Sequence, residues 1–230
     1  ACRHYLEDGE ANEPAAGSLY VVSTPIGNMG DVTLRALRIL DRVDLIAAED
    51  TRTTGNLLKR YGIGTQTTSM FARNERQKIP SLIGHLQSGK SLAVVSDAGT
   101  PGISDPAALL ISAAVGEQIP VVPVPGASAA LSALVSSGMH TERFVFEGFL
   151  PIKKRRQTKL KELAEEERTV ILYESVHRIG RTLGDLLEHL GDRQVCVARE
   201  ITKLHEEIFH GTISEALDHF TEGKQRGEFT

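Results

Sequence analysis

Five short apolar runs, separated by segments with a helical spacing of apolar residues, constrain the fold of this 230-residue chain more than any other feature. The runs are LYVVST (19–24), DLIAAE (44–49), QTTSMF (66–71), SLAVVSD (91–97) and PVVPV (120–124). Between them, residues such as Leu34, Leu37 and Leu40 recur three and four positions apart, as in amphipathic helices. Strands that are joined through helices run parallel, so the sequence predicts an α/β fold with a parallel sheet covered on both faces.

A second α/β region with a mixed sheet is expected from residue 141 onward. Its strand-like runs are FVFEGFLP (144–151), TVILYE (169–174), VCVARE (195–200) and a hairpin-like EEIFHGT (206–212), with a charged helix expected over 153–167. GEFT at the end of the chain is typical of a strand that is starting, so the last strand is expected to be truncated or very short. The predicted organisation is a disordered acidic tail at 1–17, an N-terminal domain at 18–140 and a C-terminal domain at 141–230.

Each strand of the first half is followed at once by polar, glycine or proline residues. These segments are TPIGNMGD, EDTRTT, ARNER, SDAGTPGISDP and PGASAA, whereas the helix-to-strand connections, such as LQSGK, are plainer. In a parallel sheet all five segments follow the carboxyl ends of strands and lie on one edge, where open α/β sheets bind ligands. The asymmetry predicts one extended site on that edge.

The motifs that are missing narrow the kind of site. GxxxxGK[ST], GxSxG and a GxGxxG after the first strand do not occur, so the sequence does not favour a phosphate-cradling loop, a nucleophile elbow or a dinucleotide fingerprint. The histidines and the two cysteines, Cys2 and Cys196, have no metal-ligand spacing, so no metal site is predicted. Carboxylates, hydroxyls and exposed backbone remain, which suits the transfer of an already activated group between positioned substrates.

The charge pattern limits the possible partners. The net charge is −4, and residues 17–150 carry equal numbers of basic and acidic side chains. Indiscriminate nucleic-acid binding needs clustered cations, so an RNA partner would have to be recognised by local patches. No apolar run is long enough for a membrane span, and the N-terminal residues have no apolar signal core, so a cytoplasmic protein without a membrane partner is expected.

Taken singly, most motifs have a structural as well as a functional interpretation. TPIGN fits a tight turn, and AEDTR fits a helix start with acidic residues near the positive end of the helix dipole. KKRRQTKLK places six cations in nine residues, which fits either a solvated helix face or an RNA-contacting surface. SDAGTPGISDP contains more turn-forming residues than a connecting loop needs, so it favours a ligand site.

Seven motifs occur in order along residues 18–229: LYVVSTPIGNMGD, DLIAAEDTR, VVSDAGTPGISDP, VPVPGAS, FEGFLP, YESVHR and ARExTK. This series closely resembles the ribosomal small-subunit methyltransferase I group of the tetrapyrrole methylase superfamily. The resemblance implies two α/β domains with S-adenosylmethionine bound in the cleft between them, and a homodimer. It also implies methyl transfer to the ribose 2′-oxygen of a cytidine in the decoding region of 16S rRNA. Reliance on local patches favours rRNA within the assembled 30S subunit as the substrate, and free rRNA stays the alternative.

Matching these motifs residue by residue gives candidate cofactor contacts. They are Pro25, Asp97, Ala98, Gly99, Thr100, Gly102, Ile103, Ser128, Ala129, Leu150, Tyr173 and Ala198. The Asp97 carboxylate and the amides around Gly99 and Gly102 are expected to hydrogen-bond the cofactor. Asp105 and Pro106 are expected to begin the next helix, as an N-cap followed by proline at the first helical position.

The acceptor hydroxyl must be oriented and its proton taken up, and Glu49 and Asp50, on the next loop of the same edge, are the candidates for this catalytic role. The candidate substrate contacts are Asn28, Arg52, Arg73, Asn74, Lys153, Lys154, Arg155, Arg156 and Arg178. Among these, Arg52 is expected to anchor a phosphate, and Asn74 also looks like a helix N-cap.

Two departures from the pattern and two alternatives remain. PGAS has alanine where related chains often have proline, and FARNE replaces a more histidine-rich segment. One alternative is another enzyme of the superfamily, which methylates a tetrapyrrole carbon or a modified protein histidine. The other is a non-enzymatic ribosome-assembly factor. The pair TPIGN and AEDTR favours the rRNA branch.

Overall fold

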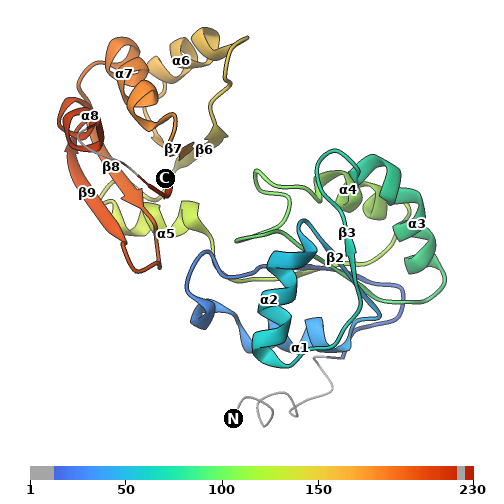
Figure 1. The fold of residues 1–230 in the computed structure, drawn as a ribbon. Coiled ribbons are helices and arrows are strands. Elements are labelled where there is room, and N and C mark those ends of the chain that lie inside the picture. Colours follow the sequence, from blue (N-terminus) through green and yellow to red (C-terminus); the bar gives the residue numbers. More distant parts are fainter. Residues whose placement is uncertain (1–12, 222–225) are drawn as a thin grey trace. The chain divides into compact units, whose positions relative to one another are not determined.

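The computed structural model describes residues 13–221 and 226–230. The chain divides between Ala127 and Ser128 into two compact units (Figure 1). Residues 1–12 of the expected acidic tail lie outside the described residues. Within the described ranges, no helix is long and apolar enough to cross a membrane.

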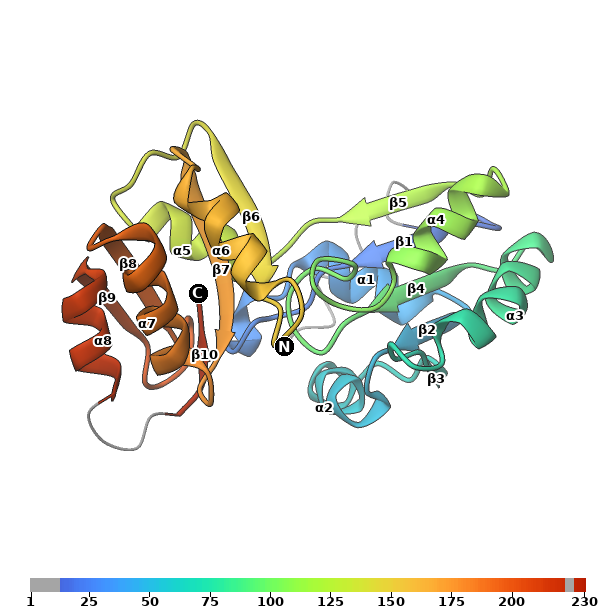
Figure 2. The same ribbon diagram turned by 90° about the horizontal axis from the view of Figure 1, so that it is seen from above.

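The first unit is built on a parallel sheet with the strand order β3-β2-β4-β1-β5 (Figure 2). Its strands are β1 (Leu19–Val22), β2 (Leu45–Ala48), β3 (Thr67–Ser69), β4 (Leu92–Val95) and β5 (Val121–Val124). Every predicted run of the first half contains one of these strands, and all their recorded pairings are parallel. The predicted parallel α/β sheet is confirmed.

Helices cover both faces of this sheet. They are α1 (Leu34–Arg42), α2 (Thr51–Tyr61), α3 (Glu75–Gln87) and α4 (Ala108–Gly116), with a short 3-10 helix, η3 (Met29–Asp31), after β1. Leu37 of α1 and Leu57 of α2 share a buried cluster with Tyr20. Leu86 of α3 and Leu110 of α4 share a second cluster with the adjacent Leu19. Since neighbouring strand residues face opposite sides, the two clusters lie on opposite faces, which explains the nearly continuous apolar strands.

The second unit contains a mixed sheet with the order β6-β7-β10-β8-β9. Its strands are β6 (Phe144–Phe149), β7 (Thr169–Ser175), β8 (Gln194–Arg199), β9 (Glu207–Thr212) and β10 (Glu228–Phe229). β6 and β7 are parallel, β8 and β9 are antiparallel, and β10 is antiparallel to both β7 and β8. The predicted mixed sheet is also confirmed.

Two apolar clusters hold the helices of the second unit to its sheet. The helices are α5 (Ala129–Ser136), α6 (Arg156–Ala164), α7 (Ile179–Leu190) and α8 (Ile213–Thr221). Leu160, Leu183 and Phe229 belong to the cluster formed by α6, α7 and α8 with the sheet. Leu134 of α5 packs with Ile171 of β7 in the other cluster. The boundary expected near residue 140 would leave α5 in the first domain, whereas in the structure this helix packs on the second sheet.

An apolar cavity of about 370 Å³ lies inside the second unit. Residues of β7, β8, α5 and α7 line it, together with Phe229 and Thr230. None of the residues predicted to bind cofactor or substrate is among the described residues of its lining. The polar chemistry that the sequence predicts is therefore found elsewhere.

Candidate active site

The loops that follow β1, β4 and β5 are bonded to one another at the carboxyl edge of the first sheet. Thr24 donates its backbone N–H to the Gly99 carbonyl at 2.9 Å, and Gly99 donates in return to the Thr24 carbonyl at 3.1 Å. The Ser23 hydroxyl lies 2.9 Å from that of Thr100. Thr100 also donates to the Ala127 carbonyl at 3.4 Å. Segments far apart in sequence therefore form one surface, as expected for parallel strands.

The loop after β4 has a strained backbone. Gly99, Gly102, Ser104 and Ala107 have φ values of +77°, +83°, +62° and +112°. This conformation is unfavourable for residues with a side chain, and such strain tends to be kept at functional sites. The Gly99 amide donates to Thr24, and the Gly102 amide donates to the Pro106 carbonyl at 3.0 Å. Both amides that were expected to face the cofactor are bonded within the loops, so we assign these glycines to the loop's shape.

The other predicted cofactor residues of the first unit differ in exposure. Pro25 is buried and Thr100 is half-buried, whereas Asp97 and Ala98 are exposed. Ile103 is an apolar side chain that is 47% exposed. The loop after β4 therefore offers a carboxylate and an apolar side chain to the solvent.

Glu75, the first residue of α3, holds the N-terminus of α4. Its buried carboxylate accepts hydrogen bonds from the N–H groups of Ala107, Leu109 and Leu110 at 3.0, 3.1 and 3.3 Å. Helix N-termini carry unsatisfied amides and favour negative charge. The prediction that Asp105 caps this helix is wrong, because the N-cap position is Ala107 and its side chain gives no cap hydrogen bond. Sequence reasoning missed Glu75, since a cap supplied by another helix leaves no local signal.

Glu49, Asp50 and Asp97 form an acidic cluster where the neighbouring strands β2 and β4 end. The Asp97 N–H donates to Glu49 Oε2 at 3.2 Å, and the Asp50 N–H donates to Asp97 Oδ1 at 3.1 Å. The backbone of each loop thus binds a carboxylate of the other. The structure brings together the two predicted catalytic carboxylates and the carboxylate predicted to bind the cofactor.

The three carboxylates of this acidic cluster differ in proton affinity. Burial raises the pKa of Glu49; the Asp97 N–H partly offsets this, and the charges of Asp97 and Asp50 add to the increase. Burial also raises the pKa of Asp97, and the charge of Asp50 contributes. Hydrogen bonds from Arg52 lower the pKa of Asp50 to about 2. Glu49 is therefore the better proton acceptor of the two predicted catalytic residues.

Asp50 and Arg52 also begin α2. Asp50 Oδ1 accepts the Arg52 N–H at 2.8 Å as the N-cap of the helix, and Arg52 Nη2 lies 2.6 Å from Asp50 Oδ2. The Arg52 side chain is 88% exposed. The helix-start interpretation of AEDTR is confirmed, and it leaves an exposed guanidinium at the same edge.

Asn28 and Asn74 shape the loops in which they lie. Asn28 Oδ1 accepts the Gly30 N–H at 2.9 Å and caps η3. Asn74 occupies the N-cap position of α3 but makes no side-chain cap bond there; its Oδ1 accepts the Phe71 N–H at 2.8 Å instead. Arg73 is exposed. Nucleotide contact by these three residues stays a prediction.

The predicted cofactor residues of the second unit lie at the start of α5 and along the sheet. They are Ser128, Ala129, Leu150, Tyr173 and Ala198. Ser128 caps α5, and the Tyr173 hydroxyl accepts the Ala130 N–H at 3.1 Å, so Tyr173 lies at the beginning of this helix. Ala198 exchanges backbone hydrogen bonds of 2.8 and 2.9 Å with Thr230. Its backbone groups are therefore engaged in the sheet.

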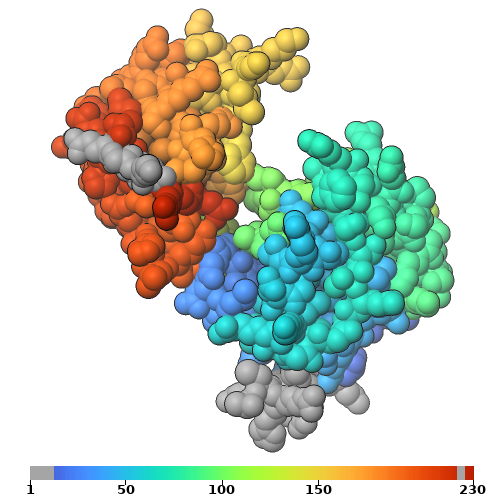
Figure 3. Space-filling model, in the orientation of Figure 1, coloured from blue at the N-terminus to red at the C-terminus, as the bar shows by residue number. Residues whose placement is uncertain are grey.

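The basic run separates into exposed and buried residues. Residues 153–155 are exposed, and they belong to the yellow to gold segment before α6 that lies at the surface in Figure 3. Arg156 is only 3% exposed and pairs with Asp185 at 2.6 Å, so its guanidinium is not part of an RNA-facing surface. Arg156, Leu160 and Leu163 are the buried residues of α6. This helical spacing was the signal in the sequence that could have identified Arg156 as buried.

Two further predictions in this region need correction. The helix expected over 153–167 begins only at Arg156, because Arg155 adopts the left-handed conformation with φ of +68°. Arg178, predicted to contact the substrate, lies 3.3 Å from Glu174 and donates to the Leu150 carbonyl at 2.6 Å. It is occupied within the second unit.

The fold and the site together define the class of protein. This is an α/β protein whose parallel sheet carries bonded polar loops and an acidic cluster on its carboxyl edge, next to a strained loop. The family model for Tetrapyrrole (Corrin/Porphyrin) Methylases matches residues 18–217. The chain belongs to this family.

Relatives and a solved structure show how far the similarity extends. The chain is 53% identical to "Ribosomal RNA small subunit methyltransferase I" of Synechocystis sp., over 93% of this chain and 77% of that protein. It is 49% identical to the Thermotoga maritima protein of the same name, over 93% and 96%. The fold matches a uroporphyrin-III C-methyl transferase from Thermus thermophilus, complexed with S-adenyl homocysteine, with a TM-score of 0.63 at 17% identity over 92% and 95% of the two chains.

Proposed function

We propose that this protein is an S-adenosylmethionine-dependent methyltransferase that acts on the ribose 2′-oxygen of a cytidine in the decoding region of 16S rRNA. The identity of 53% to a ribosomal RNA small subunit methyltransferase, over 93% of the chain, carries the proposal. The acidic cluster at the sheet edge supports it, because methyl transfer to a hydroxyl needs a proton acceptor next to the bound substrates.

The side chains at the sheet edge fit this cofactor. Its sulfonium and amino-acid end call for carboxylate and backbone partners, and its adenine calls for an apolar slot. The loop after β4, which is held by the segment around the buried Pro25, offers a carboxylate, backbone groups and an apolar side chain. The residues concerned are Asp97, Ala98, Thr100 and Ile103. When bound, S-adenosylmethionine supplies the activated methyl group.

Further cofactor contacts are proposed within the second unit. The proposal keeps Ser128, Ala129 and Tyr173, which meet at the N-terminus of α5. The proposal relies on neither Leu150 nor Ala198, because the Leu150 carbonyl accepts from Arg178 and the backbone of Ala198 is paired with Thr230. An anionic or polar end of a ligand is favoured at a helix N-terminus.

Glu49 is the proposed general base. Its raised pKa makes it a stronger proton acceptor than an ordinary glutamate. It would accept the proton of the 2′-hydroxyl as the oxygen gains its methyl group. Asp50, the other candidate, holds Arg52 and stays ionised.

The RNA contacts are proposed at exposed cations. Arg52 lies beside the acidic cluster and is placed to bind a phosphate next to the target ribose. Residues 153–155 form a second basic patch on the other unit. Asn28, Arg73 and Asn74 remain the proposed contacts to the nucleotide. Because the net charge is −4, binding depends on such local patches, and this favours the assembled 30S subunit as the substrate.

The proposal includes a cytoplasmic location, where the 30S subunit is found, and a homodimer. The location follows from the proposed substrate, and the homodimer rests on the resemblance of the motifs. Light scattering coupled to size-exclusion chromatography should give twice the mass of one chain; a single-chain mass at micromolar concentration would remove the dimer from the proposal.

Incubation with S-adenosylmethionine labelled in its methyl group tests the reaction. Naked 16S rRNA, assembled 30S subunits and a tetrapyrrole precursor are offered separately. We expect label in the 30S subunits, followed by mapping of one 2′-O-methylated cytidine with nuclease digestion. Label only in the tetrapyrrole would replace the rRNA proposal with the other branch of the family. RNA binding without label in any substrate would favour an assembly factor.

The base is tested separately with Glu49→Gln and Asp50→Asn. Both variants must first unfold cooperatively and bind S-adenosylmethionine with the wild-type affinity. We expect Glu49→Gln to lower the rate of methyl transfer by about 10²–10⁴-fold and Asp50→Asn to lower it less. Full activity of Glu49→Gln would end the assignment of Glu49 as the base.

A further inference from the structure

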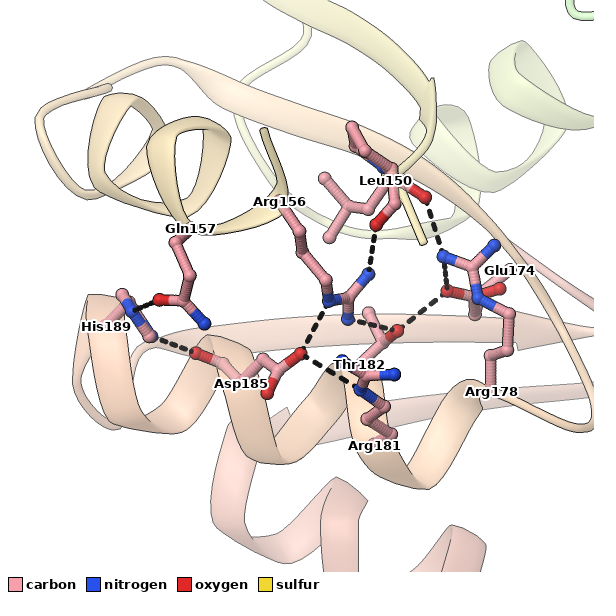
Figure 4. Close-up of polar contacts among 10 residues, drawn as sticks. Leu150, Arg156, Gln157, Glu174, Arg178, Arg181, Thr182, Asp185 and His189 are labelled. Carbon is pink, nitrogen blue, oxygen red and sulfur yellow. Dashed lines mark hydrogen bonds and ion pairs between the residues drawn. The ribbon is translucent and has the colours of Figure 1, made fainter. Parts of the chain in front are cut away.

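A chain of buried polar groups links the segment before α6 to β7 and α7 within the second unit (Figure 4). Arg156, Glu174 and Thr182 are between 3% and 4% exposed. Buried charges are costly unless they are paired and hydrogen-bonded. Here the charges of the two arginines, Arg156 and Arg178, are balanced by Glu174 and Asp185.

Arg156 binds three residues with one guanidinium. Its Nε donates to Asp185 Oδ2 at 2.6 Å and its Nη2 to Thr182 Oγ1 at 2.9 Å, both on α7. Its Nη1 donates to the carbonyl of Pro151 at 3.3 Å. The first residue of α6 is therefore fixed both to α7 and to the end of the segment that precedes it.

Arg178 makes the equivalent contact one residue earlier. Its Nη2 donates to the Leu150 carbonyl at 2.6 Å and lies 3.3 Å from Glu174 Oε2. The same Glu174 oxygen accepts the Thr182 hydroxyl at 2.7 Å. The two arginines are thus connected through Thr182 and Glu174, as the dashed lines in Figure 4 show.

Both arginines hold carbonyls that immediately precede an exposed loop. Residues 152–155, which we term the basic loop, comprise an isoleucine that is 61% exposed and three exposed cations. Leu150 and Pro151 are bound on one side of this loop, and the buried Arg156 follows on the other. A four-residue loop that is held at both ends has little freedom, and Arg155 within it has a positive φ.

The contacts to the carbonyls are the informative part of this network. A buried ion network often adds no net stability over an apolar core of the same volume, so stability alone is a weak reason for Arg156 and Arg178. An apolar side chain could fill the space, but it could not donate to the Leu150 and Pro151 carbonyls. The network therefore restrains the backbone at the start of the basic loop, which apolar packing cannot do through hydrogen bonds.

We propose that Arg156 and Arg178 are positioning residues, which hold the basic loop in one conformation and thereby present its cations to the phosphates of the RNA substrate. The inference rests on the proposed function for the identity of the substrate. Binding by a preorganised loop avoids the entropy cost of ordering the loop backbone at the moment of contact.

We term the hydrogen bonds from Arg156 and Arg178 to the Pro151 and Leu150 carbonyls the clamp. It is tested by limited trypsin digestion of the full chain, because trypsin cleaves after Lys153, Lys154 and Arg155. The variant Glu174→Gln/Arg178→Met removes the Arg178 contact without leaving an unpaired buried charge. We expect cleavage at residues 153–155 to accelerate by roughly 10- to 100-fold, the value of a lost hydrogen bond to a charged group. The matched control is Arg181→Met: this arginine is 63% exposed and lies 3.8 Å from Asp185, and no carbonyl contact is recorded for it.

The presentation of cations is tested by the salt dependence of RNA binding. Replacing Lys153, Lys154 and Arg155 by alanine should lower the slope of log affinity against log salt by about 2, at roughly 0.7 per phosphate contact on a single strand. The clamp variant keeps all three cations. We nevertheless expect a smaller slope and an affinity about tenfold lower, with wild-type affinity for S-adenosylmethionine and with Arg181→Met unchanged in every measurement.

The outcomes separate this inference from the proposed function. An unchanged trypsin rate in the clamp variant would overturn the clamp and leave the proposed function standing. Faster cleavage with an unchanged salt slope would mean that the network is structural only. If the wild-type protein methylates 16S rRNA but the alanine variant keeps the full salt slope, the basic loop is not an RNA contact and the inference fails alone. The single variant Arg178→Lys keeps a donor at this position and leaves Glu174 in place. A salt slope closer to the wild type than that of the clamp variant would support the inference.

Discussion

Replacing Glu75 by alanine should destabilise the first unit and weaken cofactor binding. Glu75 is 5% exposed, and its carboxylate is the acceptor for the amides of Ala107, Leu109 and Leu110. Alanine at this position leaves those amides without their acceptor, at the point where the loop after β4 meets α4. Since Ala107 has φ of +112°, the strained loop end then lacks the group that fixes it.

The size of the effect follows from the burial of the three amides. The hydrogen bonds from the Ala107 and Leu110 amides are buried, whereas the bond from the Leu109 amide is only partly buried, so water can replace Glu75 there. Each buried unsatisfied donor costs about 1–3 kcal/mol, and removal of the buried carboxylate returns part of this, so the net loss is about 2–4 kcal/mol. For a protein of this size that lowers the Tm by roughly 4–16 °C.

Thermal unfolding and titration calorimetry with S-adenosylmethionine measure the two consequences. Glu75→Gln keeps a carbonyl oxygen as acceptor and should recover at least half of the lost stability. Glu117→Ala is the matched control, because Glu117 is an exposed glutamate at the opposite end of α4 and should change the Tm by no more than about 1–2 °C. If Glu75→Ala unfolds within that range of the wild type, or if alanine and glutamine have equal effects, the capping argument is wrong.

Three further predictions concern the acidic cluster. Because the pKa of Glu49 is raised, the rate of methyl transfer should fall on the acid side at a pH above the ordinary glutamate pKa. At saturating cofactor, Asp97→Asn should move this fall to lower pH, since a neighbouring negative charge is removed. A carboxylate with a raised folded-state pKa contributes stability that is present below its unfolded pKa and is lost as the pH rises through the folded-state pKa. Glu49→Gln should therefore be as stable as the wild type or more stable at pH 7. In thermal scans this advantage should vanish below pH 4. Arg52→Ala should raise the pKa of Asp50 from about 2 toward 3.8 in an NMR titration; no movement would refute the assignment of Arg52 as its cause.

The sheets were predictable because their signals are local. β1 and β4 are covered on both faces, so their residues form apolar runs that end abruptly where the polar edge begins. The position of β10 between β7 and β8 was not predictable, because Glu228 and Phe229 show no sign of which strands they pair with. The same reason applies to α5, whose sequence does not say that Leu134 packs on Ile171.

The errors at the site share one physical cause, which is that a charged residue was interpreted from its neighbours in sequence. Asp105 stands before a proline and was taken as a cap, whereas the cap comes from Glu75 on another helix. Arg156 lies among cations and was assigned to the RNA surface, whereas it pairs with Asp185 on α7. Burial and long-range partners decide what a charge does, and neither is written in a local motif.

The acidic cluster shows why the choice between Glu49 and Asp50 as the proposed base depends on the structure and not on the sequence. In the sequence Glu49 and Asp50 are adjacent carboxylates, and nothing there favours one of them over the other as the base. In the structure they face different surroundings: Asp50 receives the Arg52 side chain and the first N–H groups of α2, while Glu49 is partly buried beside the charge of Asp97. Surroundings that drive two neighbouring pKa values apart are what distinguish a proton acceptor from a charge that stays ionised. Arg52 therefore acts twice in the proposed site, since by holding Asp50 it leaves Glu49 as the carboxylate best able to take up a proton.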